Sequence, residues 1–147
     1  DPPSREVLII DLEGELFFGA APDLERHLTD AARRAQQQDI RHLVLRVKRV
    51  RNPDVVAIEV LEKFLRDAAA DGLTVLLAGV RADLLSAIER VGIDRYLPAE
   101  LVFAEEDEEF SATLKAVRKA FALRAGDGDA GGSAAIAAPQ GGAYYLV

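Results

Sequence analysis

Strand-like and helix-like segments alternate along most of this chain, and this alternation constrains the fold more than any other feature. An apolar run at residues 41–47 leads through a short linker into a helical pattern that begins at Val55. Residues 73–79 form the next apolar run, and a shorter helical pattern follows at residues 82–91. Strands that are joined through helices are parallel and have right-handed crossovers. The sequence therefore predicts a small α/β domain with a mixed, mostly parallel sheet.

The N-terminal part of the chain predicts a hairpin followed by a helix. Residues 6–13 and 15–18 are rich in β-forming residues and are separated by Gly14, a residue that is common in turns. Pro22 suits the first position of a helix, and the helical spacing of apolar residues continues to residue 38. We therefore expect an antiparallel hairpin to precede the parallel strands.

The C-terminal part contains a last short strand, a helix and a tail. Residues 101–103 are apolar, and a helical pattern over residues 105–123 is acidic in its first turn and basic in its second half. This order of charge suits the helix dipole, which explains the acidic run 105–109 without a bound cation. The residues that follow are rich in Gly and Ala. We expect one domain over residues 5–123 and a flexible tail over 124–147.

Composition argues against several classes of function. The 147 residues include no Cys and only two His, so we expect no thiolate chemistry and no metal site. The net charge of −7 argues against nucleic-acid binding. No apolar run reaches the roughly 18 residues that a membrane span needs, so we expect the isolated chain to be soluble. Phosphate-binding glycine motifs and acid–base pairs are absent, which predicts no cofactor and no enzyme.

The junction at the start of the second predicted helix is the main candidate site. Asp54 is expected to cap this helix, because its carboxylate can accept from N–H groups two or three residues further on. A helix N-terminus can also hold an anion or a phosphorylated hydroxyl. The first residues of this helix are Val55 and Val56, so no hydroxyl is available there for phosphorylation.

Basic residues gather around the same junction in an otherwise acidic chain. They could contact an anion, an acidic protein or lipid headgroups, or they could form a solvated loop whose ion pairs contribute little. Arg46 differs from the others because it lies within a predicted strand and needs a partner if it is buried. Asp54 is one candidate for that partner. The cluster consists of Arg41, Arg46, Lys48, Arg49 and Arg51.

Three stretches resemble a known family. Residues 13–20 contain Gly-Glu-Leu-Phe-Phe-Gly, similar to the G-x-L-F-F-G start of the first helix in STAS domains of the SulP (sulfate permease) branch. Residues 71–79 resemble its G-hydrophobic…L-A-G strand, and residues 85–93 its L-x-x-x-G-hydrophobic helix. Together with the order of elements over roughly residues 5–123, these stretches resemble the STAS domain that sulfate transporters share with anti-sigma factor antagonists.

The chain departs from the antagonist branch at the candidate site. In that branch an Asp followed by a phosphorylatable Ser or Thr starts the second helix, commonly as D-S-x-G. Asp54 matches this Asp, Val55 stands where the hydroxyl should be, and Ala57 replaces the Gly. This departure argues against control by phosphorylation and is compatible with a transporter STAS domain.

The resemblance implies a STAS fold and a regulatory role without catalysis. In SulP proteins this domain lies at the cytoplasmic face of the cell membrane, after a transmembrane body that carries sulfate or another small anion. The expected partners are that transmembrane body, a second copy in a homodimer, and an acidic protein guided by the basic residues. The chain begins with Asp and contains no Met, as expected for a piece of a longer protein.

Two other functions stay open: a stand-alone anti-sigma factor antagonist, and a module that senses a nucleotide or an anion at the start of the second helix. In each case the same part of the chain is expected to form the contact site. Its residues are Asp54, Val55 and Val56 at the helix start, and Arg46, Lys48, Arg49 and Arg51 beside it.

Overall fold

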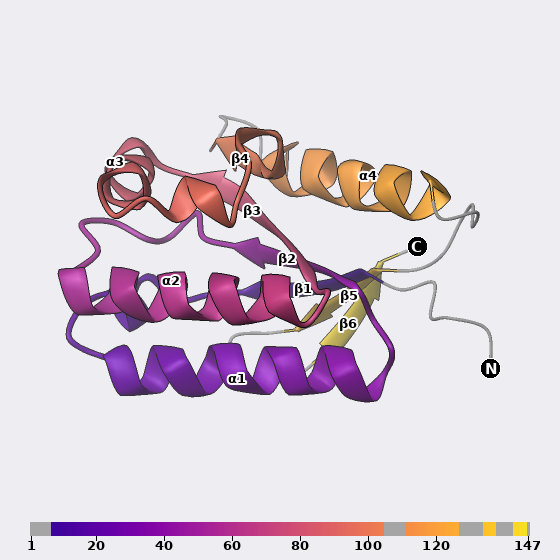
Figure 1. Cartoon of the computed structure of the whole chain (residues 1–147), viewed down its shortest axis with the longest axis horizontal. Coiled ribbons are helices and arrows are strands. Elements are labelled where there is room, and N and C mark those ends of the chain that lie inside the picture. The colour runs from indigo at the N-terminus through magenta and orange to yellow at the C-terminus, as the bar shows by residue number, and fades with distance from the viewer. Residues whose placement is uncertain (1–6, 105–110, 127–133, 138–142, 147) are drawn as a thin grey trace.

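The computed structural model of the chain has a sheet with helices on both of its faces (Figure 1). The structure describes residues 7–104, 111–126, 134–137 and 143–146. The first strands are β1 (Val7–Asp11), β2 (His42–Arg46), β3 (Thr74–Val80) and β4 (Val102–Ala104). The α-helices of the described residues are α1 (Ala21–Gln37), α2 (Val55–Ala70), α3 (Ala82–Arg90) and α4 (Ser111–Gly126), and short 3₁₀-helices are η1 (Gly14–Phe17), η2 (Ile93–Arg95) and η3 (Ala99–Leu101).

The strands form a sheet in the order β4-β3-β2-β1-β5-β6. Strands β1 to β4 are parallel, and the register places Ile10 beside Leu45 and Leu45 beside Leu77. Strand β5 (Ala134–Ala137) is parallel to β1, and β6 (Ala143–Leu146) is antiparallel to β5. The predicted α/β class with a mixed, mostly parallel sheet is confirmed.

The sheet buries apolar side chains on both faces, which explains why its strands read as continuous apolar runs. Helices α1 and α2 cover one face and α4 covers the other (Figure 1). The strand side chains on the α1–α2 face are Leu8, Ile10, Leu43, Leu45, Val75, Leu77 and Val80. The α4 face buries Val7, Ile9, Val44, Leu76 and Ala78 against Ala116, Val117 and Ala120.

The predicted N-terminal hairpin is wrong. Strand β1 is present, but the segment expected to return beside it, residues 15–18, lies largely in η1. Leu16 and Phe17 are both buried in the core on the α1–α2 side. Consecutive residues of a strand point to opposite faces of the sheet, so a strand could not bury both of these side chains in one core, whereas a helical turn can. The strands that pair with β1 are β2 and β5, and both pairings are parallel.

The C-terminal part of the chain agrees with the sequence in some elements and differs in others. Strand β4 matches the predicted strand at residues 101–103 within one residue. Helix α4 matches the predicted last helix from Ser111 onward, while the acidic run 105–109 lies outside the described residues. No strand was predicted after residue 103, and β5 and β6 are additions from the structure. The division into a domain over 5–123 and a flexible tail over 124–147 stays a prediction.

Candidate functional site

The loop between β2 and α2, residues 47–54, forms the candidate site together with the first turn of α2. The β3–α3 junction holds this loop from one side. Arg81 donates from Nε to the Lys48 carbonyl at 2.6 Å, and the Asn52 N–H donates to the Asp83 carboxylate. Asn52 also has a left-handed backbone, with φ of 47°. The path of the loop is therefore fixed by contacts with residues about 30 positions further along the chain.

Asp54 caps α2, as the sequence predicts. Its Oδ1 accepts from the Ala57 N–H at 2.7 Å. Its Oδ2 accepts from the Gly19 N–H at 2.7 Å, and its own N–H donates to the Phe17 carbonyl at 2.8 Å. One carboxylate thus satisfies a donor at the start of α2 and also ties this helix to the turn that precedes α1.

Two carboxylates of the site have lowered pKa values. The N–H groups of Gly19 and Ala57 lower the pKa of Asp54, and partial desolvation opposes them. The Asn52 N–H is the largest cause of the lowered pKa of Asp83, which desolvation again opposes. Hydrogen bonds that favour the ionised form have this effect on a carboxyl group. Both side chains therefore hold the loop as carboxylates near neutral pH.

Replacement of Asp54 should destabilise the fold in a pH-dependent way. We expect Asp54→Ala to lower the melting temperature by roughly 2–6 °C, because two N–H groups lose their acceptor. Asp54→Asn should lower it less, because the amide oxygen can still accept from Ala57. The folded pKa of Asp54 lies below the unfolded value of about 4. Its charge therefore stabilises the fold above about pH 4, and this contribution is lost as the pH falls through the folded pKa.

The measurement is thermal unfolding of the wild type and Asp54→Asn, followed by circular dichroism from pH 7 down to pH 3. The difference in melting temperature between the two proteins should shrink below about pH 4. A constant difference over the whole range would mean that the charge of Asp54 does not stabilise the fold.

Three apolar side chains are exposed around this cap. Phe18 is 72% exposed, Val55 69% and Val56 55%. Phe18 lies between Phe17 and Gly19, and both of these residues bond to Asp54. Phe18 therefore adjoins the start of α2. We call these three residues the apolar patch. Sequence analysis found the two valines but missed Phe18, because nothing in the Phe-Phe pair shows which ring is buried and which is exposed.

The basic residues of the cluster do not all lie in one place. Arg49 bonds to the Glu13 carboxylate at 3.3 Å and is about half exposed, Lys48 is half-buried and Arg51 is exposed. Arg41 precedes β2 and so lies at the other end of that strand, 4.0 Å from Asp39. The structure therefore groups Lys48, Arg49 and Arg51 at the loop. Their role as contacts to an anion or a partner stays a prediction.

Arg46 is buried and its partner is not Asp54. Its Nη1 lies 3.5 Å from Asp11 Oδ2, and its Nε donates to Thr113 Oγ1 at 2.9 Å. Asp11 is beside Arg46 in the sheet register, and Thr113 lies in the first turn of α4. The two oxygens of Asp54 instead accept from the N–H groups of Ala57 and Gly19. Arg46 thus joins β2 to β1 and α4, which leaves little of its side chain for a partner.

The described part of the chain also lacks two features that would point to other functions. No group of three or more His, Cys, Asp or Glu residues there is placed to hold a metal ion. No helix in those ranges combines the length and the apolar character that crossing a bilayer requires.

Comparisons with known proteins agree with this architecture. The model of the STAS domain family matches residues 3–109. A sulfate transporter family protein from Wolinella succinogenes is 28% identical, with 81% of this chain and 88% of that chain covered and a TM-score of 0.63. The SulP transporter STAS domain from Vibrio cholerae is 27% identical, with 78% and 86% covered and a TM-score of 0.56. No curated protein matches the chain.

Proposed function

The chain belongs to the STAS domain family, and from this we infer that it is the regulatory and interaction domain of a SulP-type secondary anion transporter. The observation that carries the proposal is the likeness to two sulfate-transporter-family structures at 27–28% identity over 78–81% of this chain. In this proposal a transmembrane body of the parent protein carries sulfate or a related small anion. The domain lies at the cytoplasmic face of the membrane, regulates that body by contact, and is not catalytic.

The loop 47–54 and the start of α2 are the proposed contact surface. The apolar patch supplies side chains whose burial against a partner is favourable, and Lys48, Arg49 and Arg51 of the loop add positive charge. An apolar centre with a charged rim is the usual make-up of a protein interface. The contacts from Arg81, Asp83 and Asp54 hold the loop in one conformation, which reduces the entropy that binding would cost.

Two features favour this role over the alternatives. The residue after the cap is Val55, so a signalling switch that depends on a phosphorylated hydroxyl at that position has no acceptor. An anion at a helix start is held by the N–H groups of the first turn. One of these, the Ala57 N–H, already bonds to the Asp54 carboxylate. Control by partner contact requires neither a phosphate nor a bound anion.

Charge reversal in the full-length protein tests the proposed surface. We expect the triple variant Lys48→Glu, Arg49→Glu, Arg51→Glu to lower anion uptake or assembly by about tenfold, which corresponds to about 1.4 kcal/mol of lost contact energy. Uptake of radiolabelled sulfate into vesicles and the amount of assembled protein in the membrane are the readouts. Unchanged values for both would remove these residues from the mechanism.

A matched control separates the local effect from that of total charge. The triple variant Arg26→Glu, Arg66→Glu, Arg90→Glu changes the net charge equally at exposed positions away from the loop. It should leave transport and assembly close to wild type. A similar loss in both triple variants would contradict the proposed location of the contact surface.

A further inference from the structure

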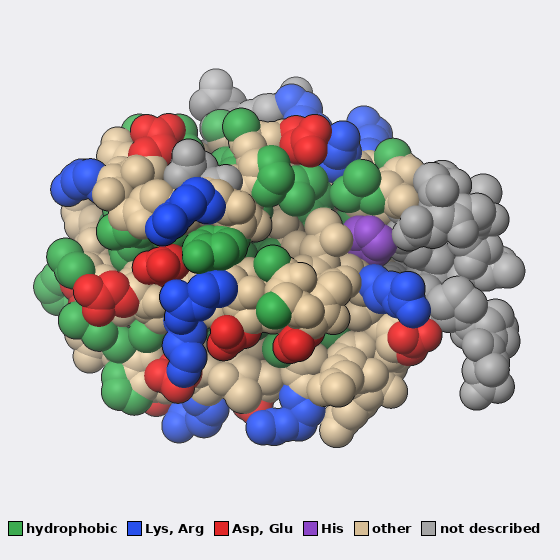
Figure 2. All heavy atoms as spheres, in the orientation of Figure 1, with side chains coloured by type: hydrophobic (Ala, Val, Ile, Leu, Met, Phe, Trp, Pro, Cys, Tyr) green, Lys and Arg blue, Asp and Glu red, His purple; other side chains and the backbone are tan. Residues whose placement is uncertain are grey.

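A groove follows the seam between α1 and α2, beyond the loop just described. In its N-terminal half it has a cavity of about 270 Å³ that both helices line. A wider hollow of about 780 Å³ continues toward the C-terminal ends of the helices, and it shares Thr29, Phe64 and Asp67 with the first cavity. We call the two together the α1–α2 groove. Figure 2 shows charged side chains of both signs over this part of the surface.

The floor of the first cavity is apolar. Leu28 is buried at its base, and Val60 and Phe64 are half-buried in its wall. Val56, which is 55% exposed, lies at its end and joins it to the apolar patch. Apolar surface therefore continues from the start of α2 into the groove. A partner that covers it would gain the free energy of burying these side chains.

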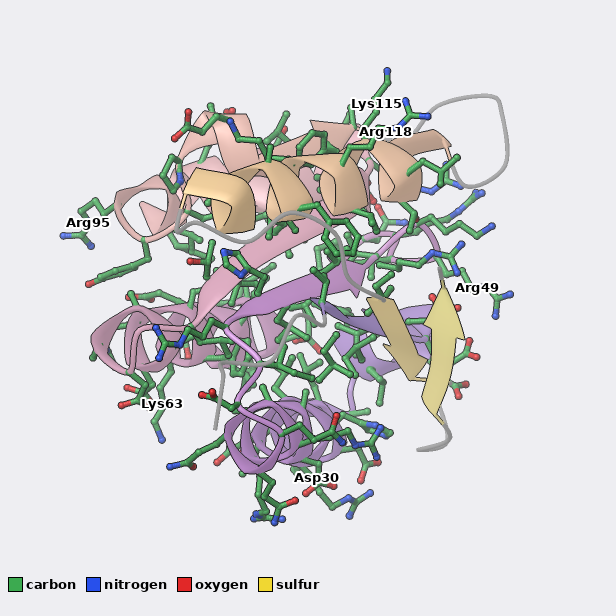
Figure 3. The ribbon with its side chains drawn as sticks, turned by 90° about the vertical axis from the view of Figure 1, so that its right-hand side faces the viewer. Asp30, Arg49, Lys63, Arg95, Lys115 and Arg118 are labelled. Atoms are coloured by element: carbon green, nitrogen blue, oxygen red, sulfur yellow. The ribbon has the colours of Figure 1, made fainter. Side chains whose placement is uncertain are left out.

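The rim of the same cavity is mainly acidic. Exposed Glu25 of α1 and exposed Glu59 and Asp67 of α2 line it, against one basic residue, Lys63. Figure 3 shows that the Lys63 side chain extends outward from α2. The chain as a whole is also acidic, with a net charge of −7. The rim therefore favours a cationic partner and disfavours an anionic one.

The size of the cavity indicates what kind of partner fits. Sites for small molecules usually measure about 300–1,000 Å³, so the first cavity, at about 270 Å³, is by itself small for a whole ligand but suits one or two apolar side chains. A groove between two helices that accepts apolar side chains at intervals is a common way of binding an amphipathic helix. A second copy of this chain, packed with the same surface on both sides, would place the acidic rims against each other.

We propose that the first cavity of the α1–α2 groove binds a basic amphipathic helix of a partner protein. An apolar side chain of that helix fills the cavity above Leu28 and contacts Val56, Val60 and Phe64. Its Lys or Arg residues face Glu25, Glu59 and Asp67. The proposal does not depend on the parent being a transporter, because this surface and its test belong to the 147-residue chain alone.

The test uses a synthetic helix as the probe. An 18-residue peptide of Leu and Lys, with Leu at i, i+3, i+4 and i+7, is labelled with fluorescein and titrated with the 147-residue chain at physiological salt. Fluorescence anisotropy reports binding. We expect saturable binding, at least about tenfold weaker binding to the double variant Glu25→Lys, Glu59→Lys, and weaker binding to Val56→Asp. A peptide with Glu in place of Lys should not bind.

A control variant with the same change in net charge makes the result specific. Glu89 in α3 and Glu100 in η3 are exposed and do not line the groove. The double variant Glu89→Lys, Glu100→Lys should bind the basic peptide nearly as well as the wild type. Equal losses in the two double variants would show attraction by net charge alone and overturn the proposal. A dimer that forms without peptide and is lost in Glu25→Lys, Glu59→Lys would assign the groove to a second copy and also overturn it.

Discussion

Replacing Arg46 with Met should lower the free energy of unfolding by about 3–5 kcal/mol, the usual result of breaking a buried ion pair by removing one partner. The side chain of Arg46 is 7% exposed and that of Asp11 is 14% exposed. Without the guanidinium the Asp11 carboxyl group would lose its partner in a site with little water, and its Oδ1 is already buried without a hydrogen-bond partner. Thr113 of α4 would lose its donor as well. Urea unfolding followed by circular dichroism measures the change.

Two further variants show whether the cost comes from the unpaired charge. In the double variant Arg46→Met, Asp11→Leu the site becomes apolar, and stability should recover to within about 1–2 kcal/mol of the wild type. Arg33→Met removes the exposed pair between Arg33 and Asp30 and should cost less than about 1 kcal/mol. If Arg46→Met costs no more than Arg33→Met, the pair with Asp11 contributes little to stability.

The order of elements was predictable because the physical cause is local in sequence. A parallel strand covered on both faces is apolar at every position, and β2 and β3 show this pattern clearly. The cap at Asp54 was predictable for the same reason, since it bonds to a residue three positions away. The resemblance to STAS domains then linked these segments into one fold, which the family match confirms.

The remaining features depend on contacts between distant residues, which a single sequence does not display. The Gly19, Asn52 and Arg81 contacts at the site join residues 31 to 35 positions apart, and Arg46 bonds to Thr113 across 67 positions. The hairpin error has the same origin. The β propensity of the Phe17–Phe18 pair favours a strand, but the burial of both Leu16 and Phe17 in one core selects a helical turn instead.

Replacing Gly14 with Ala should lower the free energy of unfolding by about 2–3 kcal/mol. A Cβ at this position would lie 2.1 Å from the backbone oxygen of Arg49 and 3.0 Å from its carbonyl carbon. Those backbone atoms belong to the loop 47–54, which Arg81 and Asp83 hold in place. The loop therefore cannot move away without losing these bonds. Urea unfolding measures the loss, and the amide NMR signals of residues 48–52 should shift.

The matched control is Gly19→Ala, five positions further along the same turn region. A Cβ there would meet nothing within 4 Å, although the backbone has a left-handed φ of +69°. It should cost about 1 kcal/mol through backbone strain alone. Equal losses of stability in the two variants would show that the close approach of the loop does not explain the cost of a side chain at Gly14. If the amide signals of residues 48–52 shift in Gly14→Ala, the loop that carries Lys48, Arg49 and Arg51 is displaced without a change in its charge. Under the proposed function, anion uptake by the full-length Gly14→Ala protein should then fall, because the proposed contact surface is displaced although its charge is unchanged.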